Sequence, residues 1–165
     1  MRRFLLVPLT MAIFLPSAYA QSDKEAITQA HWRTSEQARP VTPSDTEVLK
    51  ATPDLKRAGE GYRDMCDTSV TPKILLLDVG GTLGTVSVVI EEDSSCFGGD
   101  GAQYTVLDKG HRVLWHNSAA GIATLESRHA GVRDLIFAGP GMKVPIWIWK
   151  AAEHRFVLHT VVDTE

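Results

Sequence analysis

Six histidines are the residues of this chain best suited to acid–base chemistry or metal binding. His111 and His116 are five positions apart, as are His154 and His159, and an odd separation on a strand places two side chains on opposite faces. Neither pair alone can therefore clamp one ion. A metal or catalytic site would therefore need residues that only the folded chain brings together. The alternative function is a metal-dependent or His/Asp hydrolase that uses His116, His129, Asp134 and His159.

The sequence offers little for nucleophilic catalysis. It contains no G-x-S-x-G segment, the turn that exposes a catalytic serine. Neither Cys66 nor Cys96 is an activated thiol if the two are bridged. Asp134 precedes an apolar run, where an aspartate commonly serves as a turn or capping carboxylate. We therefore expect a non-catalytic protein without metal or cofactor.

Tryptophans are the candidate binding residues. Trp147 and Trp149 share one face of a strand, with Ile146 and Ile148 on the other. Because this strand is apolar on both faces, one interpretation is that it lies in the core. The other is that the tryptophan face is exposed and, with Trp115, forms a binding patch, since exposed aromatic clusters mark interaction sites.

The first twenty residues have the pattern of a secretory signal peptide. Arg2 and Arg3 form a basic region, Phe4–Leu15 is apolar, and Ala18-Tyr19-Ala20 is an A-x-A cleavage site. The alternative is a membrane anchor, but the apolar run is short for a bilayer. We expect a mature protein that starts at Gln21, is periplasmic or secreted, and has no membrane span.

Export bears on the two cysteines and on the net charge. An oxidising compartment and an even count predict a disulfide between Cys66 and Cys96, with two buried free thiols as the alternative.

Without Arg2 and Arg3, 17 − 2 = 15 basic side chains face 20 acidic ones, a net charge of −5. This balance argues against nucleic acid or an anionic membrane as partner.

Periodicity divides the mature chain into three parts. Residues 21–43 are polar with poor periodicity, which predicts a flexible arm, with a loosely docked helix as the alternative. Residues 44–65 carry a capping-box pattern and then apolar residues at three- and four-residue spacing, which predicts a helical segment ending near Cys66. The rest is β-branched and aromatic with Gly and Pro turns. The strands are expected at 73–78, 85–91, 103–107, 112–116, 122–127, 132–137, 144–149 and 155–159.

These elements predict one α+β domain over 44–165, in which the N-terminal helical segment packs on an antiparallel meander of seven or eight strands. The two halves of the meander also resemble each other. Gly84-Thr-Val-Ser-Val-Val-Ile matches Gly131-Val-Arg-Asp-Leu-Ile-Phe, and His111-Arg-Val-Leu-Trp-His matches His154-Arg-Phe-Val-Leu-His. One interpretation is two repeated meander units that share one core; the other is chance similarity between ordinary hairpins.

The segment Gly131-Val-Arg-Asp-Leu-Ile-Phe resembles the end of an FG-GAP unit, the repeat of integrin-type β-propellers. The glycines and Trp-x-Trp strand that follow resemble small exported bacterial proteins of unknown function. In FG-GAP units an acidic loop holds a cation before Gly-x-x-Asp, whereas residues 126–131 offer one carboxylate, Glu126. Since calcium prefers about six to eight oxygen ligands, we expect no specific calcium binding.

These observations favour a small exported binding protein that acts on an envelope protein or a carbohydrate. The hydrolase described above is one alternative. A purely structural envelope protein is another.

Overall fold

The computed structural model describes residues 22–165, so the predicted signal peptide at 1–20 and the start at Gln21 lie outside the described residues. Strands account for 51 % of the described residues and helices, short 3-10 helices included, for 17 %. The helices are α1 (Asp23–Thr28), α2 (Thr46–Ala51) and α3 (Ser94–Phe97). The strands are β1 (Arg39–Pro40), β2 (Lys56–Ala58), β3 (Gly61–Arg63), β4 (Ser69–Val70), β5 (Lys73–Gly80), β6 (Gly84–Glu92), β7 (Ala102–Leu107), β8 (Val113–Ser118), β9 (Gly121–His129), β10 (Val132–Ala138), β11 (Lys143–Lys150) and β12 (Arg155–Asp163).

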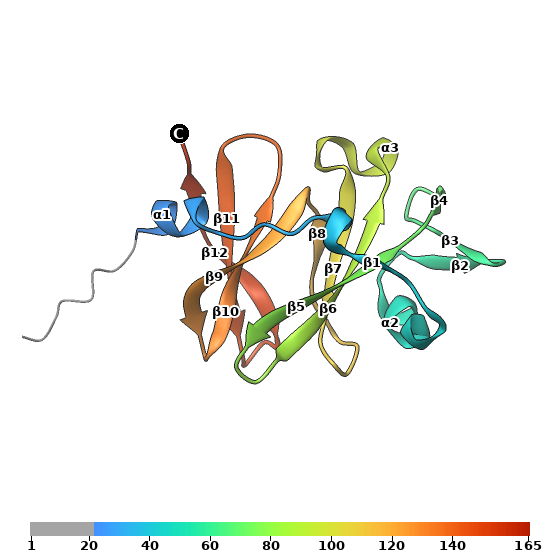
Figure 1. Cartoon of the computed structure of the whole chain (residues 1–165), viewed down its shortest axis with the longest axis horizontal. Coiled ribbons are helices and arrows are strands. Elements are labelled where there is room, and N and C mark those ends of the chain that lie inside the picture. The colour runs from blue at the N-terminus through green and yellow to red at the C-terminus, as the bar shows by residue number, and fades with distance from the viewer. Residues whose placement is uncertain (1–21) are drawn as a thin grey trace, which may run out of the picture.

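Two antiparallel meanders of similar design make up most of the fold (Figure 1). The first sheet has the order β1-β5-β6-β7-β8 and the second the order β12-β11-β10-β9. The segments that match in the sequence occupy equivalent positions. Gly84–Ile90 lies in β6, and Gly131–Phe137 consists of the turn residue Gly131 followed by β10; β6 and β10 are the second strands of the two meanders. The two His-Arg segments lead into β8 and β12, the fourth strands.

The two sheets share one central core. Alternate residues of β6, Val86, Val88 and Ile90, are buried there, together with Leu135 and Phe137 of β10. Each sheet also buries apolar residues on its outer face. Val48 and Leu49 of α2 cover the first sheet together with the small sheet β2-β3-β4, and Ile27 of α1 covers the second. The order of layers is therefore α2 with the small sheet, first sheet, second sheet, α1 (Figure 1).

The predicted α+β class is wrong, because the chain is mostly antiparallel β in three sheets. The helical segment expected over 44–65 is reduced to the six residues of α2. Thr52, which follows α2, is extended (ψ 119°), as expected of a residue before proline, and Pro53 cannot continue the helix. Gly59 then turns β2 back onto β3 with φ +62°. The apolar residues at 55–65 have helical spacing by chance, because this stretch forms the short strands β2 and β3.

In the segment predicted as a polar arm, the described residues 22–43 lie against both sheets. After α1, Arg33 pairs with Ile122 at the edge of β9, which is an isolated bridge. The chain then crosses to the first sheet, where β1 pairs with the start of β5 (Figure 1). There Arg39 donates two hydrogen bonds to the carboxylate of Asp45, each 2.7 Å long. Backbone pairing and a charge-assisted contact thus fix this segment.

The predicted disulfide between Cys66 and Cys96 is confirmed, with an S–S distance of 2.03 Å. Its position differs from the expectation, because Cys66 lies in the turn between β3 and β4 rather than at a helix end. Cys96 lies in α3, directly after β6. The bridge therefore ties the small sheet to the first meander. In the described part of the chain, no helix is both long and apolar enough to cross a membrane.

Candidate functional site

An open sheet edge is the first feature of the candidate site. β1 pairs with β5 only through Arg39 with Ile74 and Pro40 with Lys73. Pro40 lacks a backbone N–H and limits this short strand. From Leu75 onward, the outer edge of β5 has no strand partner among residues 22–165. Such an edge presents unpaired backbone donors and acceptors, and it can pair with another chain.

A groove of about 670 Å³ runs beside this edge. One wall belongs to the first sheet and carries Leu75 to Asp78 of β5. The other wall belongs to the second sheet, with Thr124 of β9 and Arg133 of β10. The segment after α1 closes one end with His31, Arg33 and Gln37. The groove therefore follows the seam where the two meanders meet, beside the segment that joins them.

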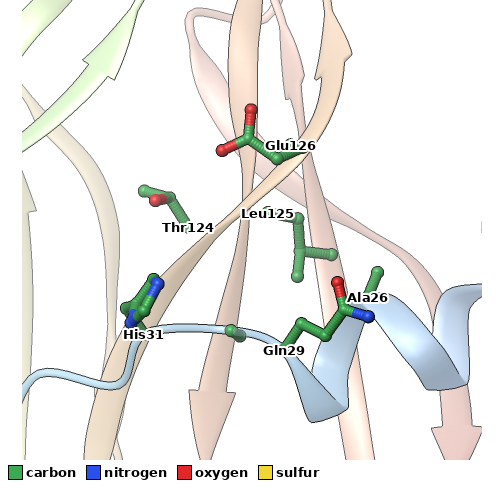
Figure 2. Close-up of a pocket in the computed structure, with 7 residues that line it drawn as sticks. Ala26, Gln29, His31, Thr124, Leu125 and Glu126 are labelled. Atoms are coloured by element: carbon green, nitrogen blue, oxygen red, sulfur yellow. The ribbon is translucent and has the colours of Figure 1, made fainter.

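A second hollow of about 210 Å³ continues the groove along β9. Figure 2 shows Ala26, Gln29 and His31 on the α1 side of this hollow, facing Thr124 to Glu126 of β9. His31 and Thr124 line both spaces. Because the two hollows share these lining residues, we refer to them together as the seam groove.

The larger part of the seam groove carries two cationic side chains and one carboxylate. Arg33 and Arg133 line this part together with His31 and Asp78, whereas Glu126 lines the smaller part. Arg133 Nη2 lies 3.5 Å from Glu126 Oε1, a distance that leaves the arginine with capacity for another acceptor. This local excess contrasts with the formal net charge of −3 for the whole chain.

The tryptophans named as binding residues do not form an exposed patch. Trp115 and Trp149 are 6 % and 3 % exposed and belong to the central core. Trp147 is half-buried against the same core, and its ring meets that of Trp115 edge-on at a centroid distance of 5.6 Å. The core interpretation of the sequence therefore holds for these residues, because the Trp face of β11 turns toward the other sheet.

Three of the four residues named for the alternative hydrolase come together on the second sheet. His129 Nδ1 lies 2.7 Å from Asp134 Oδ1, and Ser127 Oγ donates to Asp134 Oδ2 at 2.6 Å. A β-bulge between Arg133 and Leu135 changes the register of β10 at Asp134, which is 2 % exposed. The ring of His159, from β12, lies 5.7 Å from that of His129.

His116 is separate from this group and lies on the outer face of the first sheet. Its Nδ1 is 2.8 Å from Thr105 Oγ1, and its Nε2 is 3.0 Å from Gln103 Nε2. Burial lowers the pKa of His116, although Asp54 at 3.7 Å opposes this. Nearby, burial and then repulsion from Asp64 and Asp54 raise the pKa of Glu91 to about 8. These contacts describe a buried polar cluster under the disulfide-linked small sheet.

Sequence reasoning did not identify the seam groove. Its residues come from α1, the arm after it, β5, β9 and β10, which are far apart in the chain. One signal in the sequence could have pointed to the open edge: Pro40 precedes an apolar strand, and a proline limits strand pairing because it has no backbone N–H. His31 and Arg33 stood in a segment expected to be a mobile arm, so they were not considered.

No family model, curated protein or solved structure matches this chain. The FG-GAP resemblance stays a prediction from the sequence, and the function must be inferred from the geometry of the chain itself.

Proposed function

We propose that this is a small exported, non-catalytic binding protein that holds an extended segment of another envelope protein in the seam groove. The observation that carries the proposal is the open edge of β5 beside that groove. A partner strand can add to such an edge through backbone hydrogen bonds, while neighbouring pockets select its side chains.

Apolar surface is available for this contact. Leu76 lies on β5 within the groove and is 58 % exposed, although its neighbours Leu75 and Leu77 are buried. An exposed leucine beside unpaired backbone is a liability for aggregation unless something covers it. A bound strand would cover both the leucine and the backbone edge.

Charge favours an acidic partner segment. Arg33 and Arg133 stand at the groove, and guanidinium groups pair well with carboxylates because two parallel N–H donors match two oxygens. The chain as a whole is acidic, so an acidic segment would be repelled elsewhere and drawn to this surface.

Two observations favour a protein partner over a carbohydrate. Trp115 and Trp149, the aromatic rings that could stack on a sugar, are buried in the core. The groove instead offers backbone and aliphatic surface beside arginines. Export is supported by the Cys66–Cys96 bridge and by the signal-like residues 1–20.

Peptide titration tests the proposal. Labelled peptides of about ten residues, alternating Glu with Val or Lys with Val, span a typical strand and differ only in charge. Fluorescence anisotropy should show binding of the acidic peptide at least about tenfold tighter than the basic one. The double variant Arg33→Glu, Arg133→Glu should lose this preference.

Arg57→Glu is the matched control, because Arg57 is an exposed arginine of the small sheet outside the groove. It should bind like the wild type. Equal binding of both peptides, or equal losses in the double variant and in the control, would contradict the seam groove as the binding surface.

A further inference from the structure

Two histidines from distant parts of the chain face one another on the second sheet. His129 ends β9 and His159 lies in β12, and their ring centroids are 5.7 Å apart with planes inclined by 49°. His129 has 41 % of its side chain exposed, and His159 is also exposed. Solvent can therefore reach the space between the rings.

The orientation of His129 is fixed by a buried carboxylate. Its Nδ1 donates to Asp134 Oδ1 at 2.7 Å, so that Nε2 is the nitrogen left to bind a ligand. Ser127 in turn donates to the other oxygen of Asp134 at 2.6 Å. A carboxylate that holds Nδ1 of a histidine, and is itself hydrogen-bonded, is the usual outer arrangement behind a metal-binding imidazole.

The separation of the rings suits a shared ion. Zinc–nitrogen bonds are about 2.0–2.1 Å, which places two imidazole centres roughly 5.2 Å apart at a tetrahedral angle. The observed 5.7 Å is wider by a few tenths of an ångström, which a small rotation of the exposed His159 can supply. Imidazole nitrogen suits zinc, copper or nickel and not calcium.

We propose that His129 and His159 bind one divalent transition-metal ion of the zinc or copper class, and that Asp134 is the residue that positions His129. Water or an external ligand completes the coordination, since the protein supplies two nitrogens. This site is separate from the seam groove. The ligand triplet Asp64, Cys66 and Cys96 elsewhere in the described chain cannot compete for the ion through thiolates, because both sulfurs are in the disulfide.

Calorimetric titration of the tag-free protein with zinc alone tests the site. The expected result is one ion per chain at pH 7.5. His159→Ala should weaken binding by at least about tenfold. His31→Ala is the matched control, because it removes an exposed histidine outside the pair and should leave zinc binding unchanged.

Asp134→Asn tests the positioning role, with an expected loss of about 10- to 100-fold in affinity. Nitrogen-15 shifts of the His129 ring provide an independent readout, and should report a protonated Nδ1 in the wild type and a mixture of tautomers in the variant. If Asp134→Asn does not fold, Ser127→Ala with the same measurements replaces it. Zinc binding that is absent in the wild type, or equal in His159→Ala and His31→Ala, would overturn the proposal.

Discussion

The indole of Trp115 stacks on the phenyl ring of Phe137, with centroids 3.5 Å apart and planes inclined by 8°. Trp115 belongs to β8 and Phe137 to β10, so this contact joins the two meanders across the central core. Two large aromatic rings are thus buried against each other at the centre of the fold. The contact also explains why Trp115 is unavailable to a ligand.

Replacing this tryptophan should destabilise the whole domain. Trp115→Ala removes a 6 %-exposed ring and leaves a cavity between the sheets, which predicts a loss of about 3–5 kcal/mol in the free energy of unfolding. Chemical denaturation gives this value. The control Leu158→Ala changes a 52 %-exposed side chain and should cost less than about 1 kcal/mol. Equal effects would show that the sheets do not share this core.

The disulfide should stabilise the fold mainly by restricting the unfolded chain. A bridge that spans 30 positions is worth roughly 3–4 kcal/mol in the chain-entropy model. Cys66→Ser and Cys96→Ser should each lower the melting temperature by several degrees, and the double variant should be no worse than either one. The direct check is thiol labelling of the unfolded, unreduced protein. Two reactive thiols per chain would mean that the bridge is not formed.

Glu91 should make stability depend on pH. Burial raises its pKa from 4.5 to about 8, so between these values the folded state keeps a proton that the unfolded state has lost. The free energy of unfolding should therefore be highest below about pH 4.5, as far as Glu91 is concerned, and fall as the pH rises toward 8. Glu91→Gln should be more stable than the wild type at pH 8, with a shallower slope. Urea denaturation at several pH values measures this.

The control for Glu91 is Glu60→Gln in the exposed turn between β2 and β3. It should leave the pH profile of the wild type unchanged. Parallel profiles for Glu91→Gln and the wild type would mean that Glu91 ionises in the folded protein as readily as in the unfolded chain.

Gly81 should tolerate no side chain, because the turn after β5 touches the turn before β10. A Cβ at Gly81 would lie 2.7 Å from the carbonyl carbon and oxygen of Gly131, and both walls are backbone. Gly59 has a similar φ, +62° against +57°, but no atom lies within 4 Å of its Cβ position. Gly59→Ala should therefore cost about 1–2 kcal/mol for its left-handed backbone, and Gly81→Ala distinctly more. Similar melting temperatures would contradict the close approach.

The strands could be predicted from the sequence because their signals are local. The runs at Thr85–Glu91 and Val144–Trp149 are β-branched or aromatic and are bounded by turns, and both are strands of nearly these lengths. The disulfide was also predictable, from the even count of two cysteines and the signal-like pattern of the first twenty residues. The helical segment failed because local spacing at 55–65 matched a helix, while Pro53 and Gly59 divide the region into α2 and a small sheet.

The candidate site was predictable only in part. His129, Asp134 and His159 were named by residue type, but their convergence depends on the bulge in β10 and on the course of β12. The seam groove depends on two sheet edges, and sequence periodicity does not say which strand ends a sheet. Trp147 and Trp149 illustrate the same limit, since alternation shows that they share a face but not which way that face turns.

A photo-crosslinker placed at position 76 in the native cell envelope measures the central claim directly. Leu76 is 58 % exposed in the seam groove, and Leu158, 52 % exposed on β12, serves as the reference position. We predict a discrete adduct from position 76 to an acidic, extended segment of one protein, absent from position 158 and abolished by Arg33→Glu with Arg133→Glu. No adduct at position 76, or the same adducts from both positions, would contradict strand addition at β5 as the function of this protein.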